Sequence, residues 1–115
     1  MNPLILIAED DADIRALLRL YLEGDGFRVL EAENGTAALT LAREHAPDMA
    51  ILDIMMPGMN GFELTRALRK YSELPILILS AKSQDNDKIL GLNLGADDYI
   101  AKPFNPVEIV ARVKA

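Results

Sequence analysis

The chain lacks cysteine and tryptophan, and only 5% of its 115 residues are aromatic. The absence of cysteine excludes a disulfide-stapled scaffold and zinc sites built from thiolates. It is also compatible with a reducing compartment, so we expect a cytoplasmic protein. Hydrophobic residues still make up 50% of the sequence, which predicts a core built from aliphatic side chains and methionine. The length predicts one domain.

Basic residues are also few, because 12 Lys and Arg stand against 18 Asp and Glu and give a net charge of -6. This is the wrong sign for a domain whose own residues bind a nucleic-acid backbone. No apolar run approaches the roughly 20 residues that cross a bilayer, and residues 1–8 are too short for a signal peptide and lack its basic start. The sequence therefore predicts no membrane partner and no DNA contact by these residues.

Short apolar runs and segments with helical spacing alternate along the chain. Strands are expected at residues 4–8, 27–32, 49–52, 76–79 and 99–101. Helices are expected from Asp11 or Asp13, from Thr36, after Gly61, across residues 83–94, and from Asn105 and Pro106 to the last residue. The first, third and fourth strands are continuously apolar, which is typical of parallel strands covered on both faces. The alternation predicts a doubly wound α/β fold with helices on both faces of an open sheet.

Polar side chains stand at the carboxyl ends of the predicted strands. They are Glu9, Asp10, Asp53, Ser80 and Lys102. Because ligands of open α/β sheets bind outside the carboxyl ends of the strands, we expect these side chains to converge in one crevice.

Three converging carboxylates need a counter-charge, and oxygen ligands without histidine or cysteine favour Mg²⁺. A lysine and a hydroxyl beside the cation would suit a phosphoryl group. The set therefore predicts phosphoryl transfer to an aspartate. Asp53 is the expected nucleophile because it stands alone at the end of the central strand, whereas Glu9 and Asp10 are paired.

Each of these residues also has a plainer explanation. Acidic residues after strands often cap the next helix, a serine hydroxyl often satisfies local backbone groups, and a single lysine is usually solvated. Their occurrence together at corresponding strand ends is much less expected by chance than any one of them.

The chain resembles a receiver domain of a two-component response regulator over its whole length. Residues 9–11, 53–61, 80–81 and 94–104 carry the resemblance. It implies a flavodoxin-like (CheY-like) five-stranded parallel sheet in the order 2-1-3-4-5. It also implies that a sensor histidine kinase phosphorylates Asp53, with no catalysis beyond the phosphorylation and dephosphorylation of the chain itself.

The resemblance assigns further roles to individual residues. Glu9, Asp10, Asp53 and the Met55 carbonyl would bind Mg²⁺. Ser80 and Lys102 would contact the phosphoryl group, and Ser80 and Tyr99 would form a conformational switch. The Lys102–Pro103 bond is similar to the cis peptide of the family, which would aim the lysine inward.

Other phosphate and nucleotide folds fit less well. A haloacid-dehalogenase-type phosphatase needs a second carboxylate two residues after its nucleophile, where this chain has Met55. The three acidic residues at positions 9–11 would repel the phosphate of a flavodoxin cofactor. No G-x-G-x-x-G motif follows the first strand, as a dinucleotide-binding fold requires.

The chain also resembles the OmpR/PhoB-type transcription regulators, at residues 101–104 together with Leu92, Gly95, Ala96, Asp97 and Asp98. The helix pattern at the C-terminus has no capping residue after it, so we expect residues 1–115 to precede a DNA-binding effector domain. The alternative is a stand-alone receiver that signals by binding another protein. The resemblance further implies a homodimer on activation, with Lys88 opposite Glu108 and Asp97 opposite Arg112 around Leu92 and Val110.

Overall fold

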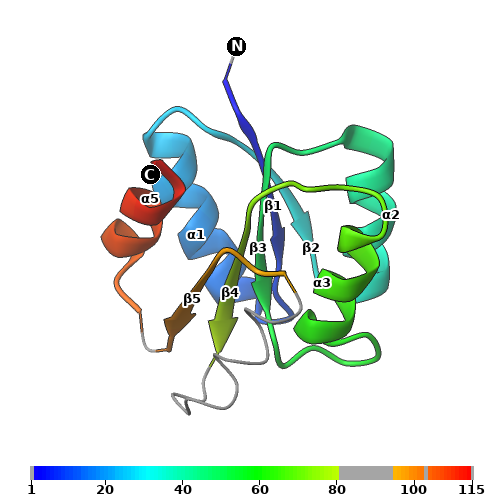
Figure 1. Ribbon diagram of the computed structural model, residues 1–115. Coiled ribbons are helices and arrows are strands. Elements are labelled where there is room, and N and C mark those ends of the chain that lie inside the picture. Colours follow the sequence, from blue (N-terminus) through cyan, green and yellow to red (C-terminus); the bar gives the residue numbers. More distant parts are fainter. Residues whose placement is uncertain (1, 81–94, 103, 115) are drawn as a thin grey trace.

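The computed structural model describes residues 2–80, 95–102 and 104–114. In this part of the chain, five parallel strands form one sheet in the order β2-β1-β3-β4-β5 (Figure 1). They are β1 (Leu4–Ala8), β2 (Arg28–Ala32), β3 (Met49–Asp53), β4 (Ile76–Ser80) and β5 (Asp98–Ala101). The predicted doubly wound sheet is confirmed, and its strand order reverses at β1, where ligands of such folds bind.

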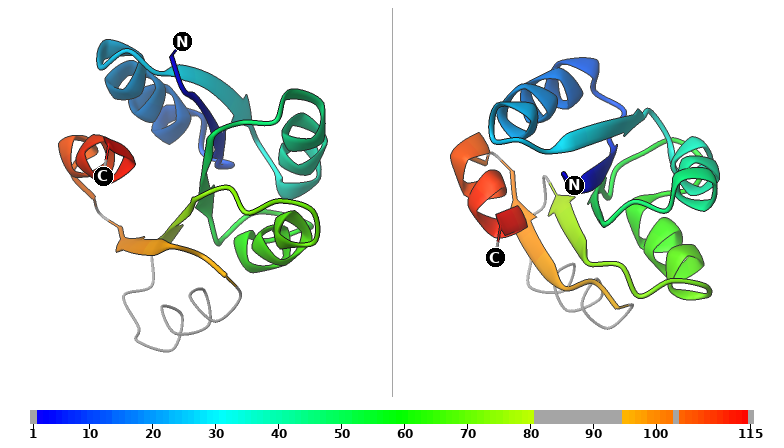
Figure 2. Two further views of the ribbon diagram at one scale, coloured as in Figure 1. Left: turned by 45° about the horizontal axis from the view of Figure 1, so that its top comes forward. Right: turned by 90° about the horizontal axis from the view of Figure 1, so that it is seen from above.

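The described helices cover both faces of the sheet (Figure 2). They are α1 (Ala12–Gly24), α2 (Gly35–His45), α3 (Gly61–Arg69) and α5 (Pro106–Lys114). Helices α1 and α5 pack on one face, and α2 and α3 pack on the other. The helix expected across residues 83–94 lies outside the described residues. Among the described helices none is long and apolar enough to cross a membrane.

The alternation of side chains along each strand separates two hydrophobic cores. In β1, for example, Leu6 and Ala8 face α2 and α3, whereas Ile5 and Ile7 face α1 and α5. Strands β3 and β4 alternate in the same way, and their hydrophobic side chains are buried, apart from Met49, which is partly buried. This confirms that the continuously apolar runs are strands covered on both faces.

The structure settles where most of the predicted elements begin. Helix α1 is capped by Asp11, whose Oδ1 accepts the amide of Asp13 at 2.9 Å. The expected cap at Thr36 is wrong, because α2 begins earlier and Asn34 caps it by accepting the amide of Ala37 at 2.8 Å. Asparagine is the stronger capping residue of the two. Helix α5 opens at Pro106 as expected.

Candidate functional site

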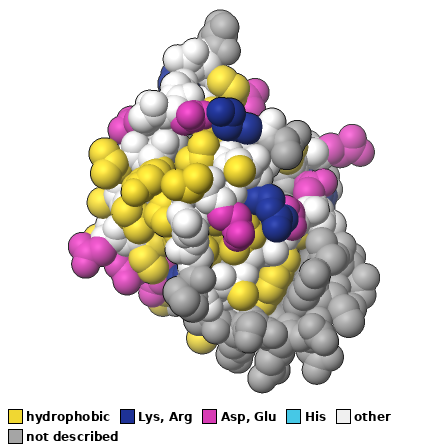
Figure 3. All heavy atoms as spheres, turned by 90° about the vertical axis from the view of Figure 1, so that its left-hand side faces the viewer, with side chains coloured by type: hydrophobic (Ala, Val, Ile, Leu, Met, Phe, Trp, Pro, Cys, Tyr) yellow, Lys and Arg dark blue, Asp and Glu magenta, His cyan; other side chains and the backbone are white. Residues whose placement is uncertain are grey.

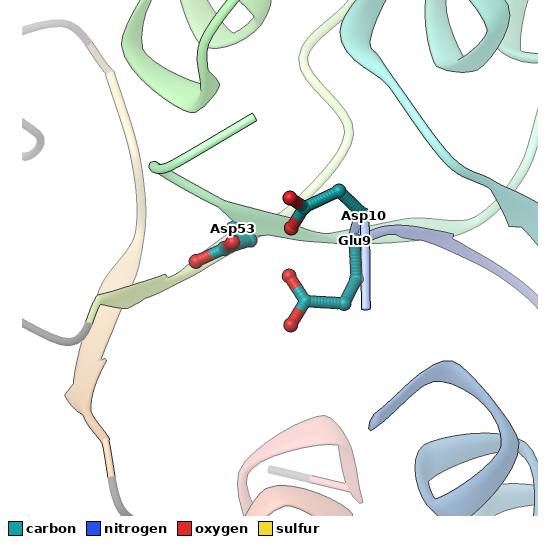
Figure 4. Close-up of side chains that lie close together, drawn as sticks. All are labelled: Glu9, Asp10 and Asp53. Atoms are coloured by element: carbon teal, nitrogen blue, oxygen red, sulfur yellow. The ribbon is translucent and has the colours of Figure 1, made fainter. Parts of the chain in front are cut away.

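Glu9, Asp10 and Asp53 converge at the carboxyl ends of β1 and β3. Each contributes a carboxylate oxygen, and these oxygens all lie within 4.8 Å of one another (Figure 4). Glu9 is 1% exposed and Asp53 is 2% exposed, whereas Asp10 is exposed at the surface. Two of the three acids therefore stand in a place where water cannot screen them.

Lys102, which follows β5, reaches across the sheet edge to this acidic cluster. Its Nζ lies 2.9 Å from Glu9 Oε1 and 3.2 Å from Asp53 Oδ1. The backbone amide of Lys102 donates to the carbonyl of the buried Ser80 at the end of β4. Four of the five polar residues singled out from the sequence thus lie together at the strand ends. The fifth, Ser80, ends β4, the strand between β3 and β5.

The buried charges of this cluster are not balanced. Burial of the Glu9 carboxyl, together with the close approach of the Asp53 carboxylate and its negative charge, raises the pKa of Glu9 from 4.5 to about 8. Burial lowers the pKa of the Lys102 ammonium, but the hydrogen bond to Glu9 and the charge of Asp53 leave that pKa above its usual value. Among the described residues one ammonium faces two buried carboxylates, so a proton on Glu9 removes the excess negative charge of this part of the site.

Two buried oxygens of this cluster have no hydrogen-bond partner among the described residues. They are Glu9 Oε2 and Asp53 Oδ1, although the latter lies 3.2 Å from the Lys102 ammonium. A buried carboxylate oxygen without a partner is costly, and hard oxygen atoms are the ligands that Mg²⁺ prefers. The donor set therefore fits Mg²⁺.

The loop between β3 and α3 borders the acidic cluster. It forms a hollow lined by Asp10, Met55, Met56 and Pro57 among others, with the Met55 side chain exposed. The loop is closed by α3, whose N-cap Asn60 forms a capping box with Glu63. Asp10 and Met55 line the same hollow, and the role of the Met55 carbonyl stays a prediction.

Gly61 lets the start of α3 pack directly against the end of β3. A Cβ atom at this position would lie 2.4 Å from the carbonyl oxygen of Asp53. We therefore expect Gly61→Ala to lower the free energy of unfolding by about 1 to 3 kcal/mol, as overpacking does. Urea denaturation measures this change.

Gly24 at the end of α1 is the matched control, because nothing lies within 4 Å of a Cβ placed there. Gly24→Ala should leave stability unchanged or raise it by up to about 1 kcal/mol. Equal destabilisation by both substitutions would contradict the importance of the contact between Gly61 and Asp53.

The residues expected to act as a switch or an interface are only partly described. Tyr99 is half-buried on β5 and packs on the side of α2 and α3. Asp97 Oδ2 accepts the amide of Ile76 at 2.8 Å and pairs with Arg69 at 3.0 Å. Arg112 pairs with Asp98 of the same chain. These contacts are made within one chain, so the switch and the dimer stay predictions.

Of the other four residues in the expected dimer interface, two are described by the structure and two are not. Glu108 and Val110 lie on α5, where Glu108 is exposed and Val110 is partly buried against α1. Lys88 and Leu92 lie outside the described residues.

The sequence analysis missed Arg15, which donates to the Glu9 carbonyl from α1. A basic residue in the second turn of a helix is usually a surface charge, so its type and position gave no signal.

Comparisons with known proteins agree with this geometry. The model of the response regulator receiver domain family matches residues 5–114. The chain is 53% identical to response regulator GtcR of Aneurinibacillus migulanus, covering 100% of this chain and 48% of that protein. It is 50% identical to DNA-binding response regulator MtrA of Mycobacterium tuberculosis, covering 100% of this chain and 50% of that protein. The chain thus spans about half the length of these curated relatives.

Solved structures show the same fold. The receiver domain of Francisella response regulator 1452 superposes with a TM-score of 0.94 at 38% identity, covering 98% of this chain and 94% of that one. The BeF3-activated N-terminal receiver domain of Klebsiella pneumoniae RstA superposes with a TM-score of 0.92 at 35% identity, covering 96% and 95%. With its strand order, its acidic cluster and its lysine in place, the chain belongs to the response regulator receiver domain family.

Proposed function

We propose that the chain is a phosphorylation-dependent switch in which Asp53 accepts a phosphoryl group from a sensor histidine kinase. The observation that carries this proposal is the pairing of a buried aspartate with a lysine ammonium beside two further acids. Treatment with acetyl phosphate and Mg²⁺ tests it, because the mass of the chain should rise by one phosphoryl group. We propose no catalysis beyond this phosphorylation and the later hydrolysis of the phosphoaspartate.

Each residue of the site has a separate role in the proposed phosphoryl transfer. Glu9, Asp10, Asp53 and the Met55 carbonyl would hold Mg²⁺, which supplies positive charge to the phosphoryl oxygens when bound. A carboxylate oxygen of Asp53 attacks the phosphorus atom while the bond to the donor nitrogen breaks. Lys102 then exchanges its carboxylate partners for a phosphoryl oxygen.

We propose that the hydroxyl of Ser80 moves toward the new charge, because β4 ends beside β3. Tyr99 lies on the neighbouring strand, in register with Ile78. We propose that movement of the Ser80 hydroxyl toward the phosphoryl group allows Tyr99 to turn inward. The switch would thereby couple the site to the surface beside β4 and β5, at that edge of the sheet.

Helices α1 and α5 carry an exposed hydrophobic surface, which favours the binding of a protein partner there. Leu20 is 68% exposed and Val107 is 61% exposed, and Leu17 and Tyr21 are also exposed. Figure 3 shows hydrophobic side chains gathered on this side of the molecule. Helix α1 begins beside the acidic cluster and α5 follows Lys102 closely, so both helices of this surface start near the site. We propose that the sensor kinase docks on this surface.

Replacing Leu20 with aspartate tests this docking surface. We expect the rate of phosphotransfer from a purified histidine kinase that phosphorylates the unchanged chain to fall by about tenfold or more, as for an exposed apolar anchor. Labelling by acetyl phosphate should stay unchanged, because this small donor needs no docking surface. Tyr71→Asp is the control, since Tyr71 is also exposed but follows α3. Equal losses in both variants would contradict the proposal.

We also propose that a DNA-binding domain follows residue 115 in the whole protein and that its activity depends on dimerisation of the receiver. The support comes from the relative MtrA, which is described as a DNA-binding response regulator and is about twice as long. We place this protein in the cytoplasm, where it would meet its DNA. A stand-alone receiver remains the alternative, and the mass of the complete gene product separates the two.

The proposed dimer uses Lys88, Leu92, Asp97, Glu108, Val110 and Arg112. We expect Mg²⁺ with beryllofluoride to move the chain from monomer to dimer in light scattering. Arg112→Glu should weaken this dimer by about tenfold or more, because a two-fold axis repeats each lost ion pair. Arg66→Glu, the same charge change on the exposed side of α3, is the control. A dimer that tolerates Arg112→Glu would place the interface elsewhere.

A further inference from the structure

The guanidinium of Arg15 reaches back from α1 to the end of β1. Its Nη1 donates to the carbonyl oxygen of Glu9 at 2.6 Å, and the side chain is 16% exposed. Glu9 is one of the two buried acids of the site, and its carbonyl belongs to the peptide bond that leads to Asp10. Arg15 therefore contacts the backbone that carries two of the three acidic side chains.

Glu31 on β2 holds Arg15 in this orientation. Glu31 Oε1 lies 3.3 Å from Arg15 Nε, and its other oxygen, Oε2, lies 2.5 Å from Arg19 Nη1. Arg19 lies one helical turn further along α1, and the contacts of its guanidinium are with Glu23, Glu31 and the Val29 carbonyl. The two arginines thus share one carboxylate, but among the described contacts Arg15 is the one that reaches Glu9.

Strand β2 also holds the backbone amide of Glu9. The amide of Glu9 donates to the carbonyl of Ala32 at 3.0 Å, next to Glu31 in the sequence. Both peptide groups of Glu9 are therefore held, one by the β2 backbone and one by an arginine that β2 orients. Because a peptide bond is planar, fixing the Glu9 carbonyl also fixes the amide nitrogen of Asp10.

We propose that Arg15 is a positioning residue of the acidic site, which holds the peptide between Glu9 and Asp10 so that both carboxylates face Asp53. The proposal rests on the proposed function, because it concerns the binding of Mg²⁺ by these acids. Groups that orient metal ligands typically change metal affinity by about tenfold to a hundredfold when they are removed.

A positioning role and simple electrostatics predict opposite changes in Mg²⁺ affinity when Arg15 is removed. Removing a positive charge near a cation site strengthens cation binding if charge alone decides. Loss of a fixed peptide orientation weakens binding, because the carboxylates must then be ordered when the cation arrives. Weaker binding in the absence of Arg15 is therefore a result that the charge alone cannot produce.

The experiment compares Arg15→Met with Arg19→Met by titrating the metal-free chains with Mg²⁺ in a calorimeter. Methionine keeps an unbranched apolar stem and removes the guanidinium, and both variants lose one positive charge. We expect the dissociation constant for Mg²⁺ to rise by about tenfold or more in Arg15→Met. In Arg19→Met it should stay within about twofold of the unchanged chain or fall, as charge removal predicts.

Glu31→Gln tests whether Glu31 on β2 acts on the site through Arg15. The substitution keeps the shape of the side chain and removes its charge. It should weaken Mg²⁺ binding less than Arg15→Met, and it should add little in a chain that already carries Arg15→Met. A full additional loss in the double variant would overturn the role of Glu31.

Three other results would overturn the role of Arg15. They are Mg²⁺ binding by Arg15→Met that equals or exceeds that of the unchanged chain, equal weakening by both methionine variants, and weakening that follows thermal stability across all variants. Failure of the unchanged chain to bind Mg²⁺ would instead overturn the proposed function, and this inference with it. The two kinds of failure are thus distinguishable.

Discussion

Asp53→Asn is expected to abolish the gain of one phosphoryl mass when the chain is treated with acetyl phosphate and Mg²⁺. The carboxylate oxygen of Asp53 is the attacking atom, and an amide in its place is a far weaker nucleophile. The side chain is 2% exposed and its Oδ1 lies 3.2 Å from the Lys102 ammonium. The amide has nearly the same size, so the fold should be retained. Intact-protein mass spectrometry measures the result.

Asp13→Asn is the control for this substitution. Asp13 lies in the first turn of α1, close in sequence to the acidic cluster, but it is exposed and belongs to no metal-binding group among the described residues. Labelling should be unchanged in this variant. Labelling of Asp53→Asn to the level of the unchanged chain would assign the phosphoryl group to another residue.

Beryllofluoride gives a second readout of the same site. Its fluoride atoms take the place of phosphoryl oxygens on the Asp53 carboxylate, so Asp53→Asn should also fail to bind it. Lys102→Ala should weaken this adduct, because the Lys102 ammonium lies 3.2 Å from Asp53 Oδ1. Agreement between both readouts would show that loss of labelling reflects the site and not the donor.

The fold was largely predictable because the sheet is central to it. Strands covered on both faces need continuous apolar runs, and the runs in β1, β3 and β4 are unlike anything a surface segment would carry. The caps were less predictable, since Asn34 and Thr36 are both suitable capping residues. The choice between them depends on packing, because Gly35 lies against Met59, a contact that local sequence does not show.

The same distinction applies to the site. The acids and the lysine could be located because strand ends in a parallel sheet meet at one edge, even though Glu9 and Lys102 are far apart in the sequence. Arg15 could not be located, because its role depends on β2 pairing with β1 and on Glu31 facing α1. Nothing in residue type or spacing separates Arg15 from Arg19. Their difference comes from contacts with Glu9 that only the assembled fold provides.

The stability of the metal-free chain should fall as pH rises from about 4.5 to about 8. The folded chain keeps a proton on Glu9 up to a pKa of about 8, whereas the usual pKa of this carboxyl is 4.5. Between these values the folded state binds more protons than the unfolded state, so the free energy of unfolding decreases with rising pH. Below 4.5 this contribution is fully retained, and above 8 it is lost. Urea denaturation in a chelating buffer measures the slope.

Saturating Mg²⁺ should abolish this dependence between pH 4.5 and 8, because the cation replaces the proton on Glu9. Its binding constant should rise by about tenfold per pH unit up to about pH 8, where the proton leaves without it. Glu9→Gln should remove this Glu9 contribution in the metal-free chain, raise stability at pH 8 and weaken Mg²⁺ binding. Glu44→Gln, which changes an exposed carboxylate on α2, should do none of these. A slope that survives unchanged in Glu9→Gln would show that another group holds the proton.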